Sequence, residues 1–234
     1  LISSEGAYKT TILGDSINPH TAIRMNTGIL DGFTISDGFT MGRAAGIELE
    51  GSGIVRRCII TENNALLMGG GLVMKGKSEL WNSVVFTNYS DRGANIVIRN
   101  TGGKIINCVF TNLYLAFFSN MIMDLDSSEL IMLNNIIFQS SDSAGTNLVY
   151  SAQNDTSGVI FDYSFVNPAP EFGNSSGIET GESGFIFYAE GSEGLNFKLE
   201  LGSPCINAGH PGAEHLNRDG TRNTIGSTGG PWGW

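Results

Sequence analysis

The sequence repeats itself with a period of about 25 residues, and this repeat limits the possible fold more than any other feature. Six similar apolar segments follow one another, the first four of them 25 residues apart and the last two at slightly longer spacing. They are Leu30–Ile35, Val55–Ile60, Leu80–Val85, Ile105–Phe110, Met132–Ile137 and Ile160–Phe165. A propeller blade needs about 40 residues and the common α-repeats need helices, so a stack of parallel coils remains.

A second short segment recurs between these copies. Its copies are Ala22–Met25, Ile47–Glu50, Leu72–Lys75, Ile96–Arg99 and Leu148–Ser151. The alternation of apolar residues is typical of a half-buried strand, and the glycine or asparagine that precedes most copies indicates a corner. The sequence therefore predicts an all-β, right-handed, single-stranded parallel β-helix of about six to seven coils over residues 1–166.

The remaining residues, 167–234, break the period. They are predicted to form a non-repetitive C-terminal cap packed on the last coil, because a solenoid must cover the apolar end of its stack. On this interpretation Ile225 packs against the end of the core near Phe165, and Trp232 and Trp234 cover that end.

One polar position also follows the repeat, two residues after the start of each apolar segment. It is occupied by Asn82, Asn107, Asn134 and Asp162 in successive coils. Neighbouring coils stack about 4.8 Å apart, so these side chains are predicted to bond to one another as a buried ladder. A ligand-binding row of amides is the alternative.

The cysteines obey the same register. Cys58 and Cys108 lie two coils apart with Ser83 between them, which puts their Cα atoms roughly 9 to 10 Å apart. A disulfide requires less than about 7 Å, so Cys58, Cys108 and Cys205 are predicted to be free thiols. The first two are interpreted as small core residues, with reactive thiols as the alternative.

Composition excludes several classes of partner. A net charge of −10 argues against nucleic acid and against an anionic membrane surface. No apolar run approaches the roughly 18 residues that span a bilayer, so no membrane insertion is expected within this chain. Charged residues make up only 15%, which suits an extracellular protein that meets sugars or other neutral polymers. The chain opens in what reads as a strand, and we expect it to be a mature or truncated piece.

One group of outward-facing side chains has the residue types that a polysaccharide lyase needs. Glu48 and Glu50 project from one coil, Lys75 from the next and Arg99 from the one after. Lys75 would take the proton beside a uronate carboxylate, Arg99 would neutralise that carboxylate, and Glu48 and Glu50 would hold calcium. The alternative is a ladder of alternating charges between neighbouring coils.

The C-terminal region holds two weaker patterns. Oxygen-bearing side chains alternate around a glycine in residues 217–223, faintly like a calcium loop, although the acidic density is low. A turn that closes the cap is the alternative. His210 and His215 lie nearby and suggest a metal, whereas exposure to solvent is the ordinary state of two histidines in a loop.

Three stretches of the chain are similar to a known family: residues 30–38, residues 69–72 together with 107–112, and a tail made of residues 197–209, 219–223 and 225–231. They resemble secreted bacterial parallel β-helix repeat proteins with a pectate-lyase-like fold, and specifically those with a choice-of-anchor Q C-terminal region. The sequence departs from the family at Cys205 and around Ser227 and Thr228. The resemblance implies export and an extracellular or cell-surface location, but it implies no reaction.

Two functions from different classes remain. The first is a non-catalytic binding or display module outside the cell, with a glycan as its ligand. The second is a polysaccharide lyase that acts on acidic polysaccharide at the Glu48–Arg99 face, with calcium as its candidate cofactor. A lyase needs long loops beside the sheet to form a groove, and the visible insertions are short, which favours the binding module.

Overall fold

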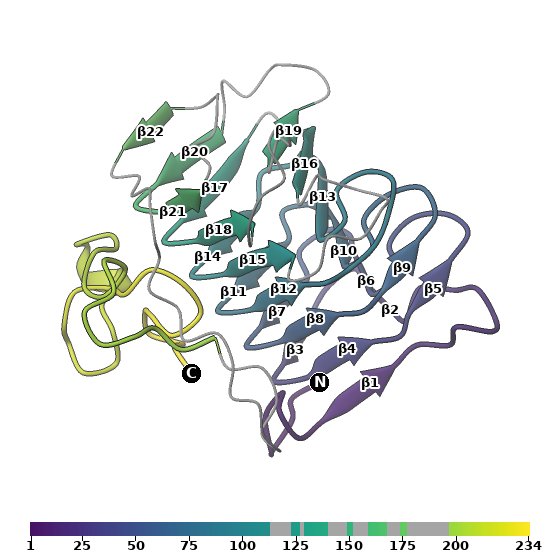
Figure 1. The fold of residues 1–234 in the computed structure, drawn as a ribbon, viewed down its shortest axis with the longest axis horizontal. Coiled ribbons are helices and arrows are strands. Elements are labelled where there is room, and N and C mark those ends of the chain that lie inside the picture. Colours follow the sequence, from purple (N-terminus) through teal and green to yellow (C-terminus); the bar gives the residue numbers. More distant parts are fainter. Residues whose placement is uncertain (113–122, 127–128, 140–148, 152–158, 168–173, 177–196) are drawn as a thin grey trace.

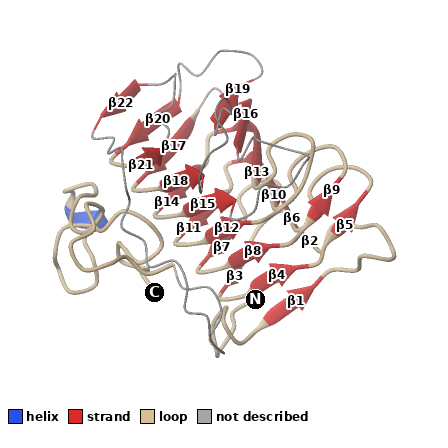
Figure 2. Cartoon of the chain, in the orientation of Figure 1, coloured by secondary structure: helices blue, strands red, loops and turns tan. Residues whose placement is uncertain are grey.

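The protein is a stack of parallel coils in a computed structural model, which describes all residues except 113–122, 127–128, 140–148, 152–158, 168–173 and 177–196 (Figure 1). The chain passes in turn through three parallel sheets, here called sheets 1, 2 and 3. Among the described residues, helix is limited to the single turn η1 (Ala213–His215) (Figure 2).

The strands of each sheet follow one another along the stack. Sheet 1 contains β2 (Ile23–Met25), β6 (Ile47–Leu49), β10 (Leu72–Gly76), β13 (Ile96–Thr101), β16 (Met123–Asp126) and β19 (Val149–Ser151). Sheet 2 contains β3 (Ile29–Asp31), β7 (Ile54–Arg56), β11 (Glu79–Trp81), β14 (Lys104–Ile106), β17 (Leu130–Leu133), β20 (Val159–Asp162) and β22 (Asn174–Ser176). Sheet 3 contains β1 (Thr11–Leu13), β4 (Thr34–Ser36), β8 (Ile59–Thr61), β12 (Val84–Phe86), β15 (Val109–Asn112), β18 (Ile136–Gln139) and β21 (Phe165–Asn167). The short strands β5 (Phe39–Thr40) and β9 (Asn64–Ala65) pair beside them.

This arrangement confirms the predicted fold class, an all-β parallel solenoid. The solenoid makes about five turns, because the chain returns to sheet 1 five times between β2 and β19. This number is slightly lower than the six to seven coils predicted. The core forms because equivalent apolar residues of successive coils stack directly: Leu72 pairs in register with Ile47 and with Ile96, and all three are fully buried. Each coil thus buries its inner face against its neighbours.

The C-terminal segment, residues 197–234, lies along the flank of the stack and not across its end as predicted (Figure 1). Ile225 is fully buried in a cluster with outward-facing residues of sheet 3, and Phe197 packs on Phe86 with ring centroids 5.0 Å apart. The physical reason is that several strands of sheet 3, from β8 to β18, carry apolar residues on their outer face as well as on their inner one. Strands such as Val84–Phe86 are continuous apolar runs, which mark a strand that is covered on both sides.

The asparagines predicted to form a ladder sit at the corner between sheets 2 and 3. Asn82, Asn107 and Asn134 are buried, with left-handed φ values of 43°, 55° and 58°. The hydrogen bonds that the structure gives these side chains go to the C-terminal segment, not along the stack. Asn82 Nδ2 donates to the Ser227 carbonyl at 3.0 Å.

Asp162 does not continue this corner position. Met132 pairs with Phe161 and Leu133 with Asp162, so the register is one residue later than predicted. The left-handed corner residue of that coil is therefore Tyr163, with a φ of 48°. Ile160, one residue before Phe161, accordingly points outward and is 45% exposed.

A buried asparagine ladder does exist, at the next turn of the coil, after sheet 3. The Gly38 N–H donates to Asn63 Oδ1, Asn63 Nδ2 donates to Asn88 Oδ1, and Asn88 Nδ2 donates to Asn95 Oδ1, each at 3.0 Å. These amides satisfy backbone groups that a sharp turn would otherwise leave buried without partners.

The three cysteines are free and buried, as predicted. Cys58 and Cys108 occupy the same inward position two coils apart, and the backbone N–H of Cys58 donates to Ser83 Oγ in the coil between them. Burial raises the pKa of Cys58 to about 11 and that of Cys108 to about 12.

We expect the native protein to react very slowly with a thiol reagent at pH 8, because a pKa of about 11 leaves about one thiolate in a thousand molecules. All three thiols should titrate once the protein is denatured without reductant. A single titratable thiol in the denatured protein would instead reveal a disulfide and contradict the coil register.

Candidate functional site

The outer face of sheet 1 carries a hollow of about 450 Å³. Strands β10 and β13 and the two turns that carry Arg43 and Met68 form its walls. Its lining residues are Arg43, Met68, Val73, Lys75, Gly76 and Arg99. The hollow includes two of the residues that the sequence marked as a candidate site, Lys75 and Arg99, which lie side by side in register on β10 and β13.

The alternation of β10 explains why the hollow has an apolar floor and a charged rim. Leu72 and Met74 point into the core, so Val73 and Lys75 project from the outer face. Val73 and Val97 are nevertheless fully buried, because the turns that carry Ala44 and Met68 pack over them. Lys75, one step further along β10, remains partly exposed at the edge of this cover.

Lys75 is held between two carboxylates of the preceding coil. Its Nζ lies 2.8 Å from Glu48 Oε1 and 2.6 Å from Glu50 Oε1. Glu48 is 8% exposed and is also paired with Arg24, at 3.3 Å, and with Arg43, at 3.6 Å. The predicted charged group therefore comes together as an ion-pair network between coils.

This network disfavours the roles that the lyase hypothesis gives to its members. Burial lowers the pKa of Lys75, but the hydrogen bonds that Lys75 donates to Glu48 and Glu50 outweigh it and hold that pKa above its usual value. A general base must lose its proton near the working pH, and Lys75 is held as an ammonium.

The pair Glu48 and Glu50 does not fit a calcium site either. Calcium takes six to eight oxygen ligands, whereas the Lys75 ammonium lies between these two carboxylates and two guanidinium groups also approach Glu48. The positive charge that a calcium ion would supply is already present in the side chains.

The loop of residues 217–223 closes on itself by hydrogen bonds. Asp219 Oδ1 accepts from the backbone and the hydroxyl of Thr221 at 2.9 and 2.6 Å. Asn217 Oδ1 accepts from the backbone N–H groups of Thr224 and Gly230 at 3.1 and 2.9 Å. These oxygens act as the caps of a turn, which favours the turn over the calcium loop.

Sequence reasoning missed Arg43 and Met68, which belong to turns and follow no strand pattern. Their positions are fixed by the pairing of the turns themselves, since Arg43 and Met68 form an isolated parallel bridge between neighbouring coils. Arg43 adds a third cation to the rim of the hollow, and its side chain is 58% exposed.

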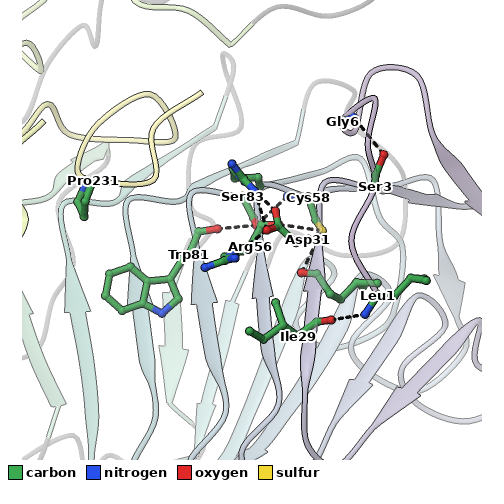
Figure 3. Close-up of polar contacts among 12 residues, drawn as sticks. Leu1, Ser3, Gly6, Ile29, Asp31, Arg56, Cys58, Trp81, Ser83 and Pro231 are labelled. Atoms are coloured by element: carbon green, nitrogen blue, oxygen red, sulfur yellow. Dashed lines mark hydrogen bonds and ion pairs between the residues drawn. The ribbon is translucent and has the colours of Figure 1, made fainter. Parts of the chain in front are cut away.

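A second charged cluster was also missed, at the corner of the first coils (Figure 3). Asp31 is 1% exposed and accepts from Arg56 Nε at 2.8 Å and from Arg57 Nη2 at 2.6 Å. Burial raises the pKa of Asp31, but the two arginines outweigh it and hold that pKa below its usual value.

Arg56 also stacks on Trp232, with its guanidinium carbon 4.2 Å from the ring centroid. The Trp234 indole N–H donates to the Asn82 carbonyl, so these tryptophans anchor the C-terminal segment to the corners.

Comparisons of the chain with protein-family models, with curated proteins and with solved structures find no match. In the part of the chain that the structure describes, no helix has the length and apolar character needed to cross a membrane. The chain is therefore described by its structure alone, as a parallel β-solenoid with a charged hollow on the outer face of sheet 1.

Proposed function

We propose that this chain is a non-catalytic binding module that acts outside the cell and binds an acidic glycan in the hollow on sheet 1. The observation that carries the proposal is the gathering of Arg43, Lys75 and Arg99 around one hollow, in a chain whose net charge is −10. A hollow whose lining, among the described residues, contains three cations and no carboxylate favours an anionic ligand.

The chemistry of the rim suits a carboxylate-bearing sugar. Guanidinium groups bind carboxylates through two parallel hydrogen bonds, and Arg43, whose side chain is 58% exposed, carries such a group at the rim. Met68 supplies apolar surface for the C–H groups of a sugar ring. Lys75 is already fixed by Glu48 and Glu50, so little side-chain entropy is lost when its charge meets a ligand.

The same arrangement favours binding over cleavage. The lyase alternative requires an unprotonated base next to the bound uronate, and Lys75 is held in the protonated form by its two carboxylate partners. Export is supported by the low content of charged residues, 15%, and by the motifs that resemble secreted β-helix proteins with a choice-of-anchor Q region.

A glycan array tests the proposal, with polyuronates and neutral polysaccharides compared side by side. We expect binding to the acidic glycans that weakens as salt is raised, since the contacts are partly exposed ion pairs. Binding confined to neutral glycans, or no binding, would contradict the proposal. Incubation with the bound polyuronate should produce no rise in the ultraviolet absorbance of unsaturated sugars, and such a rise would establish the lyase instead.

A further inference from the structure

A cluster of two histidines and one glutamate lies in the C-terminal segment, around η1. Its members are His210, Glu214 and His215, and one ligand atom from each lies within 4.8 Å of the others. The cluster is remote from the sheet 1 hollow, and the function proposed above makes no use of it. Imidazole nitrogens and a carboxylate oxygen are a donor set that divalent transition metals, zinc in particular, prefer.

The spacing of the donor atoms matches a single ion. His215 Nε2 lies 3.5 Å from Glu214 Oε1. Two ligands of one tetrahedral zinc ion, each about 2.1 Å from the metal, lie about 3.4 Å from each other. The rings of His210 and His215 are 4.7 Å apart between centroids, and all three donor atoms lie within 4.8 Å of one another, so the longer separations would shorten towards about 3.4 Å around an ion.

A backbone hydrogen bond marks which nitrogen of His210 has the lone pair. The Gly212 N–H donates to His210 Nδ1 at 3.0 Å, so Nδ1 carries no proton, and a bound ion would take the place of this hydrogen bond. A Cβ atom at Gly212 would lie 2.9 Å from His210 Nδ1 and 3.0 Å from both carboxylate oxygens of Glu214. The donor atoms of His210 and Glu214 thus lie beside the Cα atom of Gly212, where a larger residue would crowd them.

Surrounding contacts fix the cluster to the corners of the solenoid. The backbone N–H of His210 donates to Asn134 Oδ1 at 2.7 Å, and Asn223 Nδ2 donates to the His215 carbonyl. The His210 ring also packs edge-on against Tyr163, with centroids 4.9 Å apart. Partners outside the ligand set that hold the ligands in place are typical of built metal sites.

We propose that His210, Glu214 and His215 bind one divalent transition-metal ion, with zinc as the best match, and that this ion fixes the turn around η1, whose His210 backbone bonds to Asn134. The three side chains leave a fourth position for water, as in three-ligand zinc sites. The site goes beyond the proposed glycan binding and does not depend on it.

The test uses the full chain, stripped with a chelator and titrated with zinc chloride. We expect one ion per chain by calorimetry and a melting temperature raised by about 5 °C or more when free zinc exceeds its dissociation constant a hundredfold. Cobalt should give the visible spectrum of a tetrahedral site without thiolate-to-metal absorbance, because the three cysteines are buried elsewhere.

Two variants and one control locate the site. Glu214→Gln and His215→Ala should each weaken zinc binding at least tenfold, and Glu214 is exposed, so its replacement leaves the fold intact. His20→Ala removes the third histidine of the chain, which is exposed, and should bind zinc as the unaltered protein does. Absence of zinc binding, equal affinity in Glu214→Gln, or a thiolate signal with cobalt would overturn the proposal.

Discussion

Replacing Asn107 by leucine is expected to lower the free energy of unfolding by about 3 kcal/mol. The Asn107 side-chain amide donates to Asn223 Oδ1 at 2.9 Å, to the Thr224 carbonyl at 2.8 Å and to the Gly226 carbonyl at 3.1 Å. Leucine leaves these buried acceptors without a donor, and it also places a branched side chain at a φ of 55°. Urea denaturation measures the loss directly.

Asn107→Gly is the matched control, because glycine accepts the left-handed φ but makes no side-chain hydrogen bond. We expect Asn107→Gly to lose less stability than Asn107→Leu. The difference between the two variants should be about 1 kcal/mol, the cost of the left-handed conformation for a residue with a side chain. An unchanged midpoint for Asn107→Leu would show that the amide does not hold the C-terminal segment.

Removal of residues 197–234 is expected to make the protein associate or precipitate. The segment covers the outer face of sheet 3, where the buried apolar residues are Ile59, Val84, Phe86, Val109, Ile136 and Phe138. Together they would form a continuous apolar strip along the stack, which a soluble monomer rarely exposes. Size-exclusion chromatography and binding of a hydrophobic dye should both report the exposed strip.

A second truncated chain serves as its control. Val84→Lys and Val109→Lys, introduced together, place charges in the middle of the strip and should restore a soluble, monomeric species. A truncated chain that stays monomeric and melts as before without these changes would mean that the segment is not the cover of sheet 3.

The coil architecture could be predicted because it depends on a local pattern that the sequence repeats. Residues such as Ile47, Leu72 and Ile96 must all face inward once their strands stack in register. The shift at Ile160 was missed because Ile160 and Phe161 are both apolar, and only pairing with β17 decides which of them faces the core. A one-residue slip moves every side chain of a strand to the other face.

The course of the C-terminal segment could not be predicted in the same way. It is set by hydrogen bonds between residues more than 100 positions apart, such as Asn107 with Asn223, and no periodicity reports such contacts. One signal was available: Val84–Phe86 is apolar at every position, and the stretch 136–138 is too, which indicates cover on both faces of sheet 3.

The candidate site was predicted in part. Alternation along the strands placed Glu48, Glu50, Lys75 and Arg99 on one outer face, and the structure shows that the first three form ion pairs. Sequence could not distinguish a reactive lysine from a paired one, because the difference lies in distances of 2.6 to 2.8 Å between side chains of neighbouring coils. Arg43 could not be assigned to the site from the sequence, because it lies in a turn and the alternation of apolar residues is found only in the strands.

The most direct test of the account measures the affinity of an acidic oligosaccharide from the array for two charge-matched variants. Arg43→Ala removes an exposed cation from the rim of the hollow, and Lys9→Ala removes an exposed cation from a turn outside its lining. A charge-assisted hydrogen bond contributes about 1.5 kcal/mol, so calorimetry should show roughly tenfold weaker binding for Arg43→Ala and unchanged binding for Lys9→Ala. Equal affinities for the two variants would place the glycan elsewhere and contradict the account.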